Sequence, residues 1–161
     1  MKELKEKIPS RQISFLKSLL GLVLVKVGRY VSKNTFDLTN NLDEDPSGGP
    51  YLLEFEGEKK LFVDGYPDDQ GDNLLVYNEV ASNWDFSDWV LKDSSLSFAW
   101  SGCLKKPLKS IKIILDHEVE AGLEITFSDE APIYVYNKDD DLYSSRLYPF
   151  SKEHSSCVVI S

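Results

Sequence analysis

The fold is decided by residues 53–63, Leu-Glu-Phe-Glu-Gly-Glu-Lys-Lys-Leu-Phe-Val, which recur in outline as residues 125–135, Ile-Thr-Phe-Ser-Asp-Glu-Ala-Pro-Ile-Tyr-Val. Each copy follows a run typical of a β-strand, residues 23–27 in one case and 111–115 in the other. Each copy also has the pattern of a strand, a tight polar turn and a second strand. The recurrence predicts two similar β units packed on one another.

This pattern favours a mainly β (α+β) fold, an antiparallel β-sandwich built from two similar β units with a short N-terminal helix. Pro9 and Ser10 indicate where the helix begins, and Gly21 indicates its end. We expect one domain, with a helix at 10–20, a first β unit at about 22–79, a mixed aromatic segment at 81–104 and a second β unit at about 108–160.

Several finer expectations follow from periodicity. A strand at 22–31 should place its apolar side chains by alternation at Val23, Val25 and Val27. A return strand is expected at 142–148 and a short edge strand at 157–160. In the two copies of the recurrent stretch, Phe55 and Phe127 should occupy matching core positions, because each follows an apolar residue two places earlier on the same strand face.

The 161-residue chain is acidic, with a formal net charge of -9 and a pI near 4.7. This balance excludes direct nucleic-acid binding, which needs a basic surface. The acids concentrate between Asp43 and Asp93, where 14 acidic residues accompany 3 basic ones. They are either solvated loops or a face that captures a basic partner by electrostatic steering.

The start of the chain, Met-Lys-Glu-Leu-Lys-Glu-Lys, carries both signs of charge and does not match a secretory signal, so we expect a cytoplasmic protein. The longest apolar run, residues 19–25, is too short for a membrane helix, and no membrane partner is expected. Cys103 and Cys157 could form one disulfide, but two free, partly buried thiols are the expectation in a cytosolic chain.

No pattern in the chain indicates a catalytic, metal or cofactor site. Residues 68–79 resemble a calcium loop in length, but Gln70 and Asn73 break its pattern, which favours a solvated turn. His117 and His154 lie in polar surroundings with no ligand pair nearby and are expected to be exposed. The chain is therefore expected not to be an enzyme, and we expect no cofactor.

The segment 84–89 interleaves aromatic side chains with carboxylates. The tryptophans are either core residues with their acids turned to solvent, or anchors of an interface that selects a Lys- or Arg-rich partner. A carbohydrate platform would use similar aromatic side chains. The candidate partner-binding residues of the whole chain are Asp68, Asp69, Asp72, Trp84, Asp85, Asp88, Trp89, Asp139, Asp140 and Asp141.

Four stretches carry a resemblance to a known family: Leu-Val-Leu-Val-Lys-Val-Gly-Arg-Tyr at 22–30, Gly-Pro-Tyr-Leu-Leu-Glu-Phe-Glu-Gly-Glu at 49–58, Leu-Lys-Ser-Ile-Lys-Ile at 108–113 and Gly-Leu-Glu-Ile-Thr-Phe-Ser-Asp at 122–129. With the basic N-terminal segment, they resemble small β-rich immunity proteins of bacterial contact-dependent growth inhibition and related polymorphic toxin systems. The resemblance implies a cytosolic inhibitor that binds a cognate basic toxin domain, often a nuclease.

Physical reasoning from the residues agrees in part with what the resemblance implies. A nuclease site must be basic to hold phosphates, so an inhibitor gains by presenting carboxylates where the phosphates would sit. Two other functions stay open: a non-catalytic β-sandwich scaffold, and a small-ligand binder with a pocket between the two β units. A toxin gene beside the gene for this chain would distinguish the first hypothesis from these two.

Overall fold

The computed structural model describes residues 10–33, 49–65, 74–77, 87–95, 97–139 and 141–160. Within these residues, one α-helix precedes ten strands. The helices and strands are α1 (Ser10–Leu19), β1 (Leu24–Ser32), β2 (Tyr51–Phe55), the 3-10 turn η1 (Glu56–Glu58), β3 (Lys59–Gly65), β4 (Leu74–Tyr77), β5 (Trp89–Asp93), β6 (Leu108–Asp116), β7 (Val119–Phe127), β8 (Ile133–Lys138), β9 (Asp141–Ser145) and β10 (Ser155–Ile160). Within these ranges, no helix is long and apolar enough to cross a membrane.

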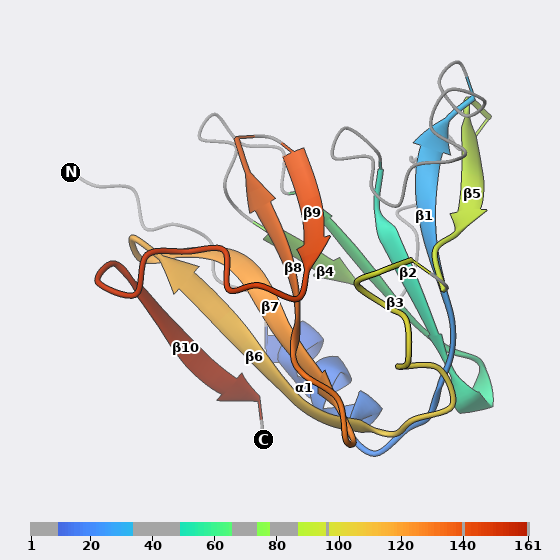
Figure 1. The fold of residues 1–161 in the computed structure, drawn as a ribbon, viewed down its shortest axis with the longest axis horizontal. Coiled ribbons are helices and arrows are strands. Elements are labelled where there is room, and N and C mark those ends of the chain that lie inside the picture. The colour runs from blue at the N-terminus through green and yellow to red at the C-terminus, as the bar shows by residue number, and fades with distance from the viewer. Residues whose placement is uncertain are drawn as a thin grey trace.

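The strands form two antiparallel sheets of five, which confirms the expected α+β sandwich (Figure 1). The first sheet has the order β4-β3-β2-β1-β5, and the second has the order β9-β8-β7-β6-β10. In each unit, four strands follow one another as a meander and the fifth pairs with the first. The connectivity of the first unit is therefore repeated in the second.

The register repeats as well as the strand order. In the first sheet Leu53 pairs with Leu61, and in the second Ile125 pairs with Ile133, which are the corresponding positions of the recurrent stretch. Phe55 opposes Leu24 on the neighbouring strand, and its counterpart opposes Leu108 in the same way. Phe55 and Phe127 are both buried. The expectation of matching core positions for these two residues is confirmed.

Each unit contains the same β-bulge at the start of its first strand. The pairing skips a residue between Leu24 and Lys26 in one unit and between Leu108 and Ser110 in the other. The extra residue turns Val25 outward, where 57% of it is exposed, and places Val27 in the core. The alternation expected at Val23, Val25 and Val27 is therefore wrong for Val25.

The two units join through reciprocal backbone hydrogen bonds between equivalent residues. Gly21 N donates to Leu108 O at 2.8 Å, and Lys105 N donates to Leu24 O at 2.8 Å. Leu24 N donates to Lys106 O, and Leu108 N donates to Leu22 O. At the centre, Val23 forms a bridge with its own counterpart, Pro107, 84 positions later. Such mutual contacts indicate an approximate two-fold axis at this point.

The described part of the mixed aromatic segment contains β5 and a set of turns that takes the place of the helix in the second unit. Trp100 lies 84 positions after Leu16 and Cys103 lies 84 positions after Leu19, and all four side chains are fully buried. A hydrogen bond from Trp100 N to Ser97 O closes one of these turns. The segment therefore repeats the core contacts of α1 with less helix.

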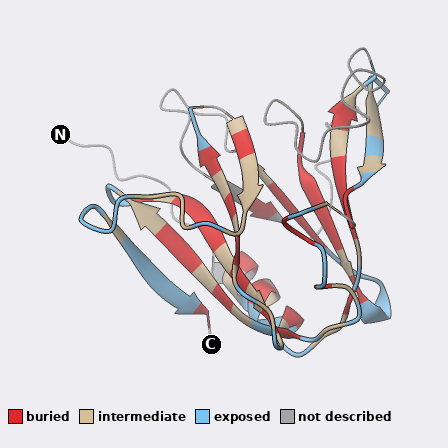
Figure 2. Ribbon diagram, viewed as in Figure 1, coloured by how far each residue is buried: buried red, intermediate tan, exposed pale blue. Residues whose placement is uncertain are grey.

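One hydrophobic core contains side chains of both sheets and of α1 (Figure 2). β3 of the first sheet contacts β8 and β9 of the second. At this contact a Cβ placed at Gly65 would lie 3.0 Å from Asn137 Nδ2, so the position accepts only glycine without rearrangement. Gly65 and Asn137 are themselves equivalent positions, 72 residues apart, so the approximate axis also passes close to them.

The helix and strand boundaries agree with expectation to within a few residues, except at the return strand. That strand, β9, ends at Ser145 instead of residue 148. Arg146 leaves the strand because its guanidinium donates to Ala99 O at 2.6 Å, to Ser101 O at 2.9 Å and to Ala131 O at 2.5 Å. The edge strand expected at 157–160 is confirmed as β10.

Truncation of either equivalent phenylalanine should destabilise the fold to a similar degree. Because Phe55 and Phe127 fill one core from the two units, we expect Phe55→Ala and Phe127→Ala each to lower the free energy of unfolding by about 3–5 kcal/mol in urea titrations. Phe98→Ala is the control, because 79% of that side chain is exposed, and it should change the value by less than about 0.5 kcal/mol. Equal losses of stability at all three positions would contradict the placement of Phe55 and Phe127 in the core and of Phe98 on the surface.

Candidate functional site

The described candidate residues lie in or beside two turns at one end of the sandwich, one turn from each sheet (Figure 1). Asp139 belongs to the turn between β8 and β9, and Asp141 is the first residue of β9. Asp88 immediately precedes β5, whose first residue is Trp89. The other six candidates lie outside the described residues: Asp68, Asp69, Asp72, Trp84, Asp85 and Asp140. Gln70 and Asn73 of the calcium-like loop and its twelfth residue, Glu79, lie outside them as well.

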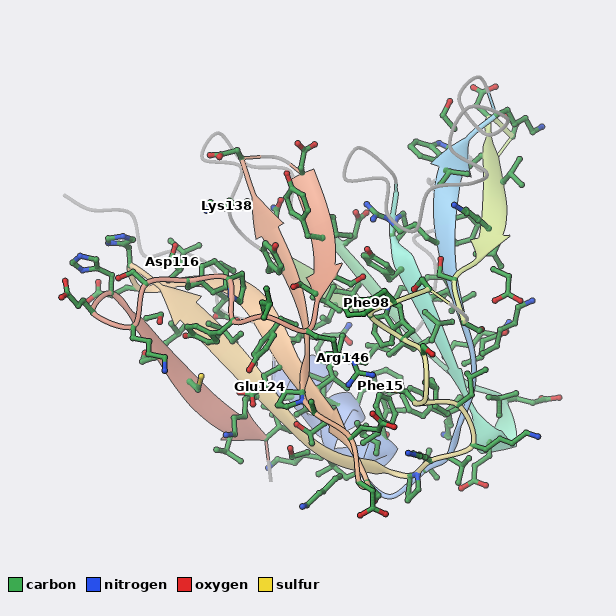
Figure 3. All side chains as sticks on the ribbon, in the orientation of Figure 1. Phe15, Phe98, Asp116, Glu124, Lys138 and Arg146 are labelled. Atoms are coloured by element: carbon green, nitrogen blue, oxygen red, sulfur yellow. The ribbon has the colours of Figure 1, made fainter. Side chains whose placement is uncertain are left out.

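The described residue of the β8–β9 turn, Asp139, is an exposed acid in a left-handed backbone conformation. Asp139 has a φ of 52° and is exposed. Asp141 opposes Lys138, which Figure 3 shows at the end of β8. Asp139 is therefore an exposed turn acid, and Asp141 lies opposite Lys138 in the register of the two strands.

The second turn combines an exposed acid with a partly buried tryptophan. Asp88 is exposed, and its carbonyl accepts a hydrogen bond from Lys33 N at 2.9 Å. Trp89 opposes Ser32 on β1, and its ring lies so close to Gly49 that a Cβ there would be 3.3 Å from it. Trp89 thus packs on the sheet and leaves part of its surface accessible beside Asp88; its role as an interface anchor stays a prediction.

The structure brings together a buried polar cluster that the sequence reasoning missed. Arg29 is 3% exposed; its Nε donates to Gly49 O at 2.7 Å, and its Nη1 donates to Tyr51 Oη at 2.9 Å. Its guanidinium carbon also lies 4.3 Å from the centre of the Tyr51 ring. Tyr51 Oη in turn donates to Ser144 Oγ at 3.1 Å, which links the first sheet to the second. We define these residues, Arg29, Gly49, Tyr51 and Ser144, as the Arg29 cluster.

Comparison of the two units shows how unusual this cluster is. The position of Arg29 is occupied by Ile113 in the second unit, and that of Tyr51 by Leu123. Both counterparts are buried apolar residues. A charged residue at an inward position of a strand was the available signal, but the bulge hid which positions of β1 face inward.

The carboxyl of Asp64, on β3, interacts electrostatically with the Arg29 guanidinium. Burial raises the pKa of Asp64, while the hydrogen bond from its neighbour Gly65 N, at 2.8 Å, and the charge of Arg29 lower it in part. The carboxyl therefore holds its proton to a higher pH than its ordinary value of 3.8. A buried arginine and a carboxyl with a raised pKa thus share one electrostatic environment.

The two histidines are exposed as expected, but they are neighbours in space. Their rings stack with 4.6 Å between centroids, and His117 N donates to His154 O at 2.9 Å. The pair arises because His117 lies in the turn after β6 and His154 immediately precedes β10, which pairs with β6. Across the described ranges, no group of three histidine, cysteine or acidic side chains is placed to hold a metal ion.

Both cysteines are free thiols, as expected, but only one is buried. Cys103 is buried in the core, and Cys157 is exposed on β10. Burial raises the pKa of the Cys103 thiol, while Arg146 opposes part of this rise and donates to its Sγ at 3.2 Å. The expectation of partial burial is therefore wrong for Cys157.

Two exposed apolar side chains were also missed. Phe98 and Leu147 are each 79% exposed, and they adjoin Ala99 and Arg146, which are joined by a hydrogen bond (Figure 3). Arg146 therefore holds two segments from different parts of the chain in one place, each presenting an apolar side chain to solvent.

Asp64 should make stability depend on pH. Because its pKa is raised on folding, its favourable contribution is complete below its ordinary pKa and is lost as the pH rises through the raised value. Asp64→Asn cannot ionise and keeps an oxygen for Gly65 N. Relative to the wild type, this variant should therefore gain stability as the pH rises from about 3 to about 7 in urea titrations.

Asp93 provides a control, because its pKa is shifted in the opposite direction to that of Asp64. Hydrogen bonds from the Ser95 backbone and side chain lower the pKa of this carboxyl, so its contribution to stability grows as the pH rises. Asp93→Asn should lose stability relative to the wild type over the same range. Parallel behaviour of the two variants would contradict the environment assigned to Asp64.

The chain was compared with family models, curated proteins and solved structures, and no family model, curated protein or solved structure matches it. Two features of the described residues bear on function: the acidic turns at one end of the sandwich, and the partly accessible Trp89 beside Asp88.

Proposed function

We propose that this chain is a cytoplasmic immunity protein that binds a basic toxin domain, a nuclease, and neutralises it by covering the active site. The observation that carries the proposal is the exposed pair of turns at one end, Asp88 from the first sheet and Asp139 from the second. Both turns are held by strands of one packed sandwich, so a partner would meet acids in fixed positions. The resemblance of residues 22–30 and 49–58 to immunity proteins supports the same function.

Electrostatics favour a basic partner over a neutral one. With a net charge of -9, the protein attracts cations and repels nucleic acid. A nuclease site is basic because it must hold phosphates, so the carboxylates would take the place of phosphate groups there. Trp89, partly buried beside Asp88, would supply the apolar anchor that charges alone lack. In this proposal the protein inhibits by occupation and catalyses nothing.

The direct test is to search beside the gene for this chain for one that encodes a toxin domain, and to measure protection against that domain. Co-expression should restore growth of cells that produce this domain, and the purified proteins should form a complex. Failure of both results would contradict the immunity function. A complex without protection would contradict coverage of the active site.

Charge reversal at the acidic turns should slow association with that toxin domain. Because steering is screened over about 10 Å at 0.1 M salt, Asp88→Lys and Asp139→Lys should lower the association rate much more at low salt than at high salt. Asp129→Lys is the matched control: Asp129 is an exposed turn residue with a φ of 61°, in the β7–β8 turn at the opposite end (Figure 1). An equal effect of all three changes would show that net charge, rather than this end, governs binding.

The stacked histidines test the non-catalytic part of the proposal. Removal of both imidazoles in His117→Ala/His154→Ala should leave protection in the growth assay unchanged, because neither side chain belongs to the acidic turns. Circular dichroism would show that the variant is folded. A folded variant that no longer protects would identify the histidine pair as part of the function.

A further inference from the structure

We infer that β10 is a self-association edge, at which a second copy of this chain pairs with it antiparallel to join the two second sheets into one. The observation is a difference between the edge strands of the fold. Edge strands present unpaired backbone groups, and proteins protect them with charges, short length or bulges. Three of the four edges have such protection, and β10 does not.

The counterpart of β10 in the first unit, β5, carries charged residues at the equivalent edge positions. β5 pairs with β1 as β10 pairs with β6, with Lys92 opposite Arg29 and Val158 opposite Ile113, the residue equivalent to Arg29. Thus Lys92 and Asp93 of β5 correspond to Val158 and Val159 of β10. The other two edges are β4, of four residues, and β9, which begins with Asp141.

β10 is suited to pairing with itself. Its sequence, Ser-Ser-Cys-Val-Val-Ile, has no charge and no proline, and its valines are 49% and 57% exposed. Figure 2 shows the strand exposed along most of its length at the margin of the second sheet. An antiparallel pair places the same uncharged strand on both sides, so two acidic chains can meet here without like charges in direct opposition.

The charges on the neighbouring strand favour the antiparallel arrangement. Asp116 of β6 opposes Ser155 at the start of β10, whereas Lys109 lies two residues beyond Ile111, which opposes Ile160 at the end. In an antiparallel pair, the acidic end of one copy lies beside the basic end of the other. Three strand spacings, about 14 Å, separate β6 of one copy from β6 of the other, so this attraction is weak and screened by salt, but its sign favours the antiparallel pair.

The pairing is isologous and therefore closes on itself. It produces one ten-stranded sheet per dimer, which ends on β9 of each copy, and no free β10 edge remains to recruit a third chain. The acidic turns lie away from β10 in Figure 1, so the dimer would leave both proposed toxin surfaces accessible. The inference goes beyond the proposed function and does not depend on it.

Sedimentation velocity over a range of concentrations tests the inference. The wild type should show a reversible dimer, and Val159→Lys should raise its dissociation constant by about tenfold or more, because a charge at the edge blocks pairing. Val25→Lys is the matched control, since Val25 is also a strand valine that is 57% exposed but lies on β1, away from an edge. This control should dimerise like the wild type.

Hydrogen exchange provides a second readout that needs no variant. Amides of residues 155–160 in the wild type should become more protected as the concentration rises through the dissociation constant, while the rest of the chain is unchanged. A wild type that stays monomeric at every concentration would overturn the inference. So would a dimer that Val25→Lys weakens as much as Val159→Lys does, or protection that appears only outside β10.

Discussion

The structure depends on the bridge between Val23 and Pro107, where the two β units are joined backbone to backbone. Four hydrogen bonds surround the bridge in reciprocal pairs, so each unit completes the first strand of the other. The N–H of Val23 is satisfied by Glu56 Oε1 at 3.1 Å, whereas Pro107 has no N–H to satisfy. The carbonyls of Val23 and Pro107 are also used in the same way. Val23 O accepts a hydrogen bond from Glu56 N, just after β2, and Pro107 O accepts one from Ser128 N, just after β7.

The approximate two-fold relation makes departures from it informative. Most core positions are apolar in both units, and strand register and bulge are shared. The largest departure is the Arg29 cluster, which places a guanidinium where the second unit has Ile113. A buried ion is a poor source of stability, because its desolvation offsets its attraction. Its hydrogen bonds, however, tie Tyr51 to Ser144 across the sheets and so favour one arrangement of the two units.

Hydrogen bonds and exposure distinguish the surface residues that stabilise the fold from those that do not. Arg146 is a structural residue: it donates to three carbonyls and lies 3.6 Å from Glu130, which bonds Lys106 at 2.7 Å. Asp88 and Asp139 make no comparable contribution to the core, because they are exposed in turns. Their position at one end is compatible with a role in recognition, and this is why the proposed function centres on them.

Local sequence determined most of the elements, the two-unit architecture and the matching of Phe55 with Phe127, because turn residues and apolar periodicity act over a few positions. It also indicated the β10 edge. It did not predict β5, which lies in the segment of mixed periodicity. Tertiary structure alone decided the exposure of Val25, the burial of Arg29 and the stacking of His117 on His154. A bulge shifts which side chains face inward, and strand pairing brings together residues far apart in sequence. No local pattern encodes either effect, because both depend on contacts between strands.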